Sequence, residues 1–271
     1  ELEPGIPNIY SLKALCDVLQ KRGVKDFPIH IKLDTGMHRL GFMTEELDEL
    51  TEFLKDCSYV KVKSVYSHLA ASDDPSCDEF TLGQIELFQK NADALSESLG
   101  YKPMYHVLNS AGIERFTQYQ FDMVRLGIGI YGVSAIPGNK LHPVASFKCK
   151  VLQVKTLKPE AGTIGYGRHG KISKDGTVVA TIPVGYADGL DRHLSRGKGM
   201  FSINGHRVPT IGNICMDMTM LDVTGLDVKV GDTVTIFGED PTVSELAEIL
   251  GTIPYEILTS VPRRIERVIV K

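Results

Sequence analysis

The chain has 271 residues, which is enough for one large domain or two modest ones. Its hydrophobic fraction of 42% and charged fraction of 24% are ordinary for a globular enzyme and exclude a disordered chain. The net charge of −4 argues against a dedicated nucleic-acid-binding protein, which usually carries a basic excess. No apolar run approaches the roughly 18 residues that cross a bilayer, and the opening residues do not resemble a signal peptide. We therefore expect no nucleic-acid or membrane partner.

The cysteines are odd in number and widely scattered along the chain. They are Cys16, Cys57, Cys77, Cys149 and Cys215. No Cys-x-x-Cys pair or Cys/His cluster occurs, so the sequence predicts neither a disulfide framework nor a metal site. Unpaired thiols of this kind are typical of the reducing cytoplasm, where we expect the protein to act.

Helical and extended patterns alternate over the first 135 residues. Helices are expected from a cap at Ser11 to Gly23, from Thr44 through Leu54, and from Ile85 to Gly100. Strands are expected at 29–34, 60–68, 105–109 and 123–131. This alternation favours a parallel α/β arrangement.

After Pro137 the pattern becomes mainly β. Apolar residues alternate with polar ones from Ala145 to Val151, and Ile203-Asn204-Gly205-His206 predicts a tight hairpin. Gly231-Asp232 predicts another turn, and one late helix is expected from a capping box at 242–245 to Gly251. The sequence thus predicts an α/β domain over 1–136 and a C-terminal mainly β domain over 137–271.

The strand at 29–34 places polar side chains on one face. His30, Lys32 and Asp34 alternate with apolar residues and point inward near the carboxyl end, where barrel enzymes place their sites. Arg39 follows in a loop that contains two glycines and could hold a carboxylate through both arms of its guanidinium. A purely structural role for this arginine is the alternative.

Three later strand ends carry further candidates. His68 ends one strand, although a histidine in the core would look the same. In 109–112, the hydroxyl of Ser110 and the neighbouring amides suit a phosphate at a strand-to-helix turn. Arg125 lies among apolar residues and needs a partner, because a buried unpaired charge is expensive. Burial alone leaves its functional and structural roles equally open.

Two tyrosines of the second domain lie in glycine-rich loops. Tyr166 stands between two glycines, and Tyr186 follows Gly185. A phenol has a reference pKa near 10 and serves as a base only where neighbours stabilise its anion, so packing is the alternative role.

Seven segments of the chain form an ordered set of motifs. They are KLDTGMHRLGF at 32–42, SHLAASD at 67–73, NSAG at 109–112, DMVRLGIGIYG at 122–132, GYG at 165–167, IPVGYADG at 182–189 and GNICMD at 212–217. Taken in order, these segments resemble the alanine racemases, pyridoxal-phosphate enzymes of fold type III that pair a (β/α)8 barrel with a C-terminal β domain. The resemblance implies that 1–136 supplies about strands 4–8 of the barrel, with 7–11 matching the fourth strand.

The resemblance implies three catalytic roles. Tyr166 matches the base that exchanges the α-proton on one face of the substrate aldimine. His68 matches the histidine that hydrogen-bonds this tyrosine, and Arg125 matches the arginine that contacts the pyridine nitrogen.

It also implies binding roles. Cofactor contacts are implied for Ser110, Asn109, Gly127, Ile128 and Arg125. Contacts to the substrate are implied for Arg39, Met216 and Tyr186, and carbamylation is implied for Lys32, which would orient Arg39.

Two departures from the family pattern stand out. The family's cofactor lysine lies in an early Lys-Ala-x-Ala-Tyr-Gly segment, which does not occur in the 271 residues. We therefore expect the first three barrel strands and this lysine to precede residue 1, and the 271 residues alone to be inactive. Arg263 stands where some members have a phosphate-binding tyrosine.

The sequence thus predicts a homodimeric enzyme that interconverts L- and D-alanine for cell-wall synthesis, with a site shared between the two copies. Two alternatives remain: racemisation of serine or another small amino acid, and a non-catalytic dimerisation region of a larger, fused cell-wall enzyme.

Overall fold

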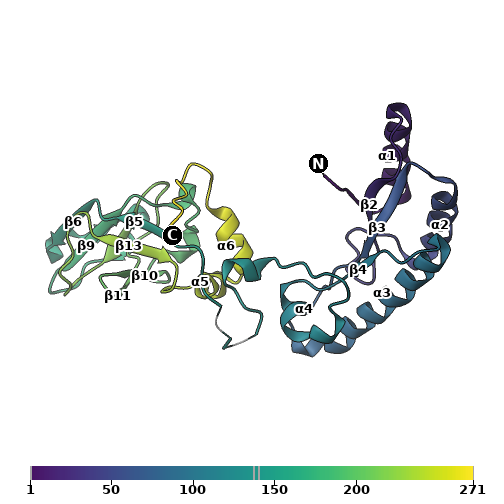
Figure 1. Cartoon of the computed structure of the whole chain (residues 1–271). Coiled ribbons are helices and arrows are strands. Elements are labelled where there is room, and N and C mark those ends of the chain that lie inside the picture. Colours follow the sequence, from purple (N-terminus) through teal and green to yellow (C-terminus); the bar gives the residue numbers. More distant parts are fainter. Residues whose placement is uncertain (1, 137, 140, 271) are drawn as a thin grey trace. The chain divides into compact units, whose positions relative to one another are not determined.

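The computed structural model describes residues 2–136, 138–139 and 141–270 (Figure 1). The chain divides into two compact units, one formed by Glu1–Gly129 with Ser134–Lys140 and the other by Ile130–Val133 with Leu141–Lys271. Residue 137, where the predicted second domain begins, lies outside the described residues. The exact boundary therefore stays a prediction, and each unit is described by itself.

The first unit contains a four-stranded parallel sheet of order β1-β2-β3-β4. Its strands are β1 (Gly5–Ile6), β2 (Phe27–Lys32), β3 (Val60–Tyr66) and β4 (Met104–His106). His30 pairs with Ser64, and Tyr66 pairs with His106. Because the strands are parallel, their carboxyl ends meet at one edge of the sheet.

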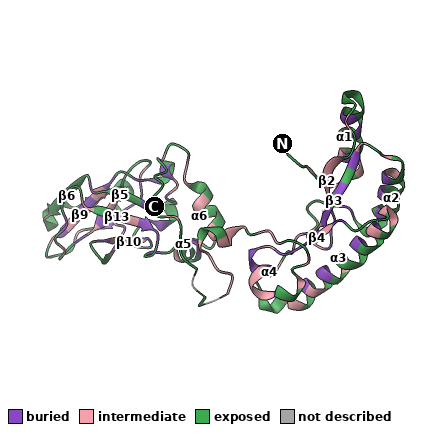
Figure 2. Cartoon of the chain, viewed as in Figure 1, coloured by how far each residue is buried: buried purple, intermediate pink, exposed green. Residues whose placement is uncertain are grey.

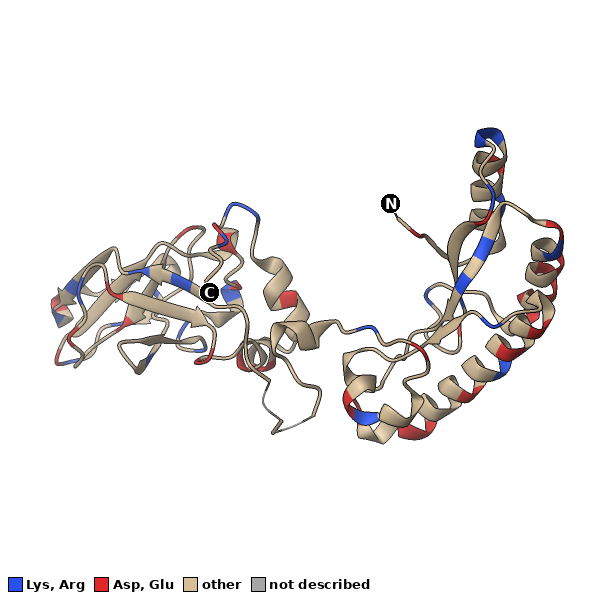
Figure 3. Cartoon of the chain, in the orientation of Figure 1, with Lys and Arg blue, Asp and Glu red and all other residues tan. Residues whose placement is uncertain are grey.

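Helices connect these strands, as the alternating pattern predicts. They are α1 (Ile9–Arg22), α2 (Leu47–Asp56), α3 (Asp78–Leu99) and α4 (Ser110–Arg115), with 3-10 turns at Thr44–Glu46, Pro75–Cys77, Thr117–Tyr119 and Ile128–Tyr131. The inner face of α3 buries Ile85, Phe88, Ala92 and Leu95 in the core (Figure 2). Acidic residues follow the exposed side of the same helix (Figure 3).

The capping residues in the sequence predict the ends of α1 and α3 correctly, but the predicted start of α1 is wrong. Gly23 and Gly100 end α1 and α3 in the left-handed conformation, with φ of 65° and 73°, which glycine adopts without strain. The predicted cap at Ser11 is wrong. Asn8 caps α1, since its side chain accepts a hydrogen bond from the Ser11 amide, so the helix begins three residues earlier.

Two predicted strands are absent. Residues 123–131 form no strand, although Asp122 and Arg125 each donate a backbone hydrogen bond to the 105–108 segment. These two backbone hydrogen bonds are too few to form the regular hydrogen-bonding pattern of a β-strand pair. Residues 7–11, which resemble a barrel strand, lie at the start of α1, and the strand is the preceding pair Gly5–Ile6.

The second unit is mainly β, as predicted. Its sheets have the orders β11-β10-β13-β5, β12-β9-β6 and β7-β8. The strands are β5 (Phe147–Lys150), β6 (Gln153–Leu157), β7 (Thr163–Ile164), β8 (Gly170–Lys171), β9 (Thr177–Ile182), β10 (Met200–Ile203), β11 (His206–Pro209), β12 (Thr219–Asp222) and β13 (Thr233–Phe237). Their buried faces form a core separate from that of the first unit.

In the second unit, too, residues close together in the chain specify the turns and helix ends. The predicted hairpin is confirmed, with Ile203 paired to His206 across Asn204 and Gly205, whose φ values are 48° and 79°. The predicted late helix is α5 (Val243–Leu250), which ends at Gly251. The sequence missed a second helix, α6 (Pro254–Ser260), in which proline occupies the first turn.

Replacing the cap of α5 should weaken the second unit. The Thr242 hydroxyl accepts a hydrogen bond of 3.1 Å from the Glu245 amide. Thr242→Ala should therefore lower the free energy of unfolding by about 1 kcal/mol, as measured by chemical denaturation. Ser244→Ala, at the exposed second position of the same helix, is the control. An equal loss in both variants would contradict the capping role.

None of the helices in the described part of the chain combines the length and the apolar character needed to span a bilayer.

Candidate active site

Polar and aromatic side chains gather at the carboxyl edge of the parallel sheet. Lys32 ends β2, Tyr66 ends β3 and His106 ends β4. The Lys32 Nζ lies 5.4 Å and the Arg125 Cζ 5.3 Å from the centre of the Tyr66 ring, which stacks on His106 at 5.0 Å. Two cations thus share one aromatic ring at the edge where barrel enzymes bind substrates.

Arg125 is held in place by neutral acceptors. Its guanidinium donates to the carbonyl oxygens of Ser67, His106 and Val107, at 2.5, 3.1 and 3.2 Å, and to the His106 Nδ1 at 2.6 Å. Among the described residues it forms no ion pair with a carboxylate. The hydrogen-bond partners of Arg125 are therefore backbone carbonyls and a histidine. Because these acceptors are neutral, they do not neutralise the positive charge of its guanidinium.

The direction of these hydrogen bonds fixes a chain of five residues. Arginine has no acceptor, so the His106 Nδ1 must accept and its Nε2 must carry the proton. That Nε2 donates to the Ser64 Oγ at 2.8 Å, and the Ser64 hydroxyl in turn donates to the His30 Nδ1 at 2.6 Å. The His30 Nε2 donates to a Glu3 carboxylate oxygen at 3.0 Å. His106 is thereby held neutral as an acceptor for Arg125.

The charges at this edge suppress protonation of nearby groups. Burial, followed by the charges of Arg125, Lys32 and Arg39, lowers the pKa of His68 to about 4. Burial and the charges of Arg125 and Arg39 also lower the pKa of Lys32. His68 is therefore neutral at pH 7, and Lys32 gives up its proton more readily than an ordinary lysine.

The loop after β2 presents Arg39. The Asp34 carboxylate accepts hydrogen bonds of 3.0 Å from the Gly36 and His38 amides, which fixes the start of this loop. Burial raises the pKa of Asp34, but these amides outweigh burial and keep it below its usual value. Arg39 itself is exposed, yet its charge reaches both Lys32 and His68.

A small backbone cradle surrounds Ser110. The amides of Gly127 and Gly129 both donate to its Oγ, at 2.8 and 3.2 Å. Asn109 has a structural use, since its Oδ1 accepts from the Gly112 amide and the Ser72 hydroxyl. The predicted phosphate residues Asn109, Ser110 and Gly127 are therefore brought together, and Ile128 follows directly at the start of a 3-10 turn.

Three loops of the second unit meet around its candidate residues. The Asn213 side chain donates to the Tyr166 carbonyl at 2.9 Å, and the Tyr186 amide donates to the Cys215 carbonyl at 3.0 Å. The side chains of Tyr166, Tyr186 and Met216 are exposed at 71%, 46% and 59%. This unit therefore presents the predicted base and two predicted substrate contacts on connected loops.

Arg263, the second departure from the family pattern, is exposed in the second unit. Its neighbour Arg264 forms an ion pair of 2.7 Å with Asp188.

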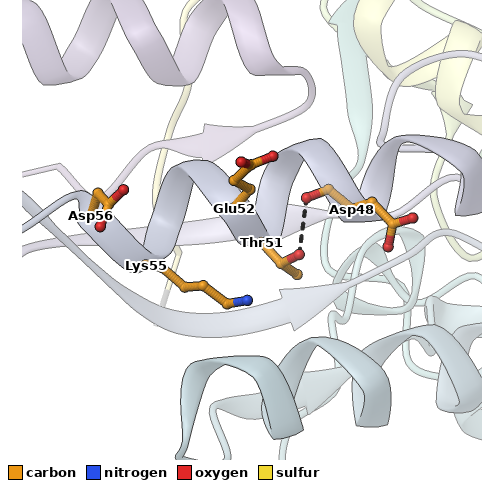
Figure 4. Close-up of a pocket in the computed structure, with 5 residues that line it drawn as sticks. All are labelled: Asp48, Thr51, Glu52, Lys55 and Asp56. Carbon is orange, nitrogen blue, oxygen red and sulfur yellow. Dashed lines mark hydrogen bonds between the residues drawn. The ribbon is translucent and has the colours of Figure 1, made fainter.

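A surface hollow on α2 is unrelated to this chemistry. It is lined by Asp48, Thr51, Glu52, Lys55 and Asp56 (Figure 4). The Thr51 hydroxyl bonds back to the Asp48 carbonyl, and no candidate residue lines the hollow. Charges of both signs at helical spacing are typical of a solvated helix face.

Sequence reasoning missed His106, Ser64 and Tyr66. His106 is 4% exposed, and Ser64 is fully buried. The available signal was a hydrogen-bonding side chain near the carboxyl end of each strand: Ser64 pairs with His30, and Tyr66 pairs with Lys32 on one side and with His106 on the other.

His106 should make stability depend on pH. Burial, with the charges of Arg125 and His30, lowers its pKa to about 4 from an ordinary 6.5. As pH falls below about 6.5 the unfolded chain binds this proton first, so stability decreases until the folded pKa is reached. Between pH 7 and pH 5 this residue should cost about 2 kcal/mol of unfolding free energy.

Denaturation curves at both pH values should therefore show a smaller decrease for His106→Gln, which can accept from Arg125 without titrating. His193→Gln is the control, because the His193 side chain is 85% exposed. An unchanged pH dependence in His106→Gln would exclude this role.

The fold and the site together define a class: an α/β unit that gathers cations and backbone amides around its strand ends, followed by a β unit that presents exposed tyrosines. Residues 1–135 match the family model described as "Alanine racemase, N-terminal domain", and residues 144–269 match "Alanine racemase, C-terminal domain". The chain therefore belongs to the alanine racemase family.

Individual proteins agree with this membership. The chain is 38% identical to alanine racemase 1 of Clostridium acetobutylicum, over 90% of this chain and 65% of that protein. It is 35% identical to the alanine racemase of Synechocystis, over 99% of this chain and 73% of the relative. The chain thus spans about two thirds of the length of such relatives.

Solved structures give the same result. The alanine racemase of Streptomyces lavendulae has a TM-score of 0.90 at 28% identity, covering 98% of this chain and 72% of that one. The enzyme of Bartonella henselae, solved with covalently bound pyridoxal phosphate, has a TM-score of 0.81 at 32% identity, covering 98% of this chain and 73% of that one.

Proposed function

We propose that the protein interconverts L- and D-alanine with pyridoxal phosphate as its cofactor, and so supplies D-alanine for cell-wall synthesis. The observation that carries this proposal is the half-buried Arg125, which is held by neutral acceptors and retains a full positive charge beside Lys32. An arginine in this setting can donate a hydrogen bond to a ring nitrogen without giving up its proton.

The residues present fit this cofactor. The Gly127 and Gly129 amides both donate to the Ser110 Oγ, which orients this hydroxyl so that its own proton can be donated to a phosphate oxygen. Ser110, Asn109, Gly127 and Ile128 would hold the phosphate, and Arg125 would hold the pyridine nitrogen. When bound, the cofactor withdraws electrons from the alanine Cα and makes the α-proton removable.

The chain's own residues then move and position the proton. Tyr166 takes the α-proton from the L-face or returns it there. In the assembled enzyme His68 would hydrogen-bond this phenol, as the family resemblance implies, and the low pKa of His68 keeps its imidazole neutral. Arg39 and the Met216 amide bind the substrate carboxylate, and Tyr186 lines the entry. Arg125 keeps the ring nitrogen unprotonated, which weakens electron withdrawal and limits proton return to the wrong atom.

Lys32 is proposed to be carbamylated. Only a neutral amine adds carbon dioxide, and the lowered pKa of this buried lysine makes the neutral form accessible. The resulting anion would orient Arg39 and offset the charge of Arg125. A high-resolution crystal structure of the assembled enzyme is expected to show density for the carbamate. A bare ammonium group at this position would overturn the assignment.

The lysine that forms the Schiff base, which is also the second catalytic base of the family, is proposed to come from outside these 271 residues. The family's Lys-Ala-x-Ala-Tyr-Gly segment is not present in them, and they span 65% of the length of the Clostridium acetobutylicum relative. We propose that this segment supplies the remaining barrel strands, so that 1–136 contributes a partial barrel. We further propose a cytoplasmic homodimer in which Tyr166 of one copy serves the cofactor of the other.

The direct test incubates the complete protein with pyridoxal phosphate and L-alanine in deuterated water. Formation of D-alanine with deuterium at Cα supports the proposal. Two outcomes would overturn it: faster racemisation of L-serine would indicate a racemase for another small amino acid, and no exchange with either substrate would indicate a non-catalytic dimerisation region.

A further inference from the structure

Two cysteines meet in the core of the first unit, away from the candidate site. Cys16 lies in the middle of α1, and Cys57 directly follows α2 as its C-cap residue. Their sulfur atoms are 3.2 Å apart although 41 positions separate them in the chain. A disulfide requires about 2.05 Å between the sulfurs, so a closure of roughly 1.2 Å would join them.

The two thiols differ in accessibility. Cys16 is 6% exposed and packs in the core, whereas Cys57 is half-buried at its margin. Burial and then the hydrogen bond with Cys57 raise the pKa of Cys16 to about 12, which keeps this thiol protonated. An oxidant from solvent therefore meets Cys57 first, and Cys16 stands ready as the second thiol.

We propose that Cys16 and Cys57 form a reversible disulfide under peroxide, a modification that is independent of the racemase function. The Cys57 thiol attacks hydrogen peroxide and becomes a sulfenic acid with release of water. The Cys16 sulfur then displaces the hydroxyl group from the Cys57 sulfur, and its proton leaves with that group as a second water. Two electrons pass from the two sulfurs to the peroxide, and a dithiol reductant reverses the reaction by exchange.

This bond would tie α1 to the end of α2, and β2, which ends at Lys32, lies between the two helices in the chain. Closing a loop of this length restricts the unfolded chain. The oxidised protein is therefore expected to melt on the order of 5–10 °C higher than the reduced protein.

The test treats the complete protein with hydrogen peroxide, blocks free thiols, and digests it with trypsin without reduction. We expect a disulfide-linked pair of peptides, 14–21 with 56–61, that separates on adding dithiothreitol. The rise in Tm should vanish in Cys57→Ser and in Cys16→Ala, and persist in Cys77→Ser, which removes a half-buried thiol whose contacts are to Ser76 and Asp74.

Recovery of both peptides unlinked, with their thiols blocked, would overturn the proposal. Conversion of Cys57 to a sulfinic acid without a linked peptide would also overturn it, as would a cross-link only between chains. A Tm rise that survives in Cys57→Ser would show that the stabilisation has another source.

Discussion

Tyr166→Phe in the complete protein is expected to abolish racemisation while leaving the cofactor bound. The substitution removes one hydroxyl from a side chain that is 71% exposed, so the fold loses little. General acid–base groups contribute roughly 10²- to 10⁴-fold to a rate, and loss of a base on one face stops exchange from that face. We therefore expect turnover in both directions to fall by at least about 10³-fold.

The measurement is the rate of D-alanine formation, together with the absorbance of the bound cofactor. Tyr10→Phe is the matched control, because Tyr10 is 81% exposed on α1 and is not one of the candidate residues. Turnover of Tyr166→Phe close to that of the parent enzyme would remove Tyr166 from the mechanism. Loss of bound cofactor would instead indicate a structural role for its hydroxyl.

Arg125→Lys is expected to divert the reaction towards pyruvate. Lysine can donate its proton to a ring nitrogen, whereas arginine retains its proton at any ordinary pH. A protonated ring withdraws electrons more strongly, so the proton returns more often to the wrong atom. We expect pyruvate formation per racemisation event to rise on the order of tenfold or more.

The geometry adds a second cost to this substitution. A single ammonium cannot reproduce the fork that bonds at once to Ser67, His106 and Val107. The free energy of unfolding should therefore also decrease. Arg115→Lys is the control, because Arg115 is a similarly shielded arginine that pairs with Asp78 outside the site. An unchanged ratio of pyruvate to D-alanine in Arg125→Lys would count against its role at the ring nitrogen.

Much of the local structure was predictable because it depends on neighbours in the chain. Glycine at positions 23, 100 and 251 ends helices in the left-handed conformation that other residues adopt with strain. Asn204-Gly205 similarly specifies its hairpin. The same locality explains the errors, since residues 123–131 have a strand-like pattern but the segment makes only isolated backbone hydrogen bonds to 105–108 and no strand.

The site residues likewise divide into those that a local sequence pattern identifies and those that only tertiary contacts reveal. Lys32, Arg39, His68, Arg125 and Tyr166 were found in the sequence through motifs and an interrupted apolar pattern. The sequence could state that Arg125 needs a partner but could not identify it. The partner was His106, oriented through Ser64 and His30 from neighbouring strands.

The amino-acid sequence by itself thus determined the two-part α/β and β organisation, most helix ends and turns, and the family. These features follow from the residue types at caps and turns, from the spacing of apolar residues, and from the order of the motifs along the chain. The tertiary structure alone decided which groups meet: the cations that share Tyr66, the tautomer of His106, and the contact of Cys16 with Cys57. Those contacts depend on strand register and helix packing between residues tens of positions apart, and no local pattern encodes such distances.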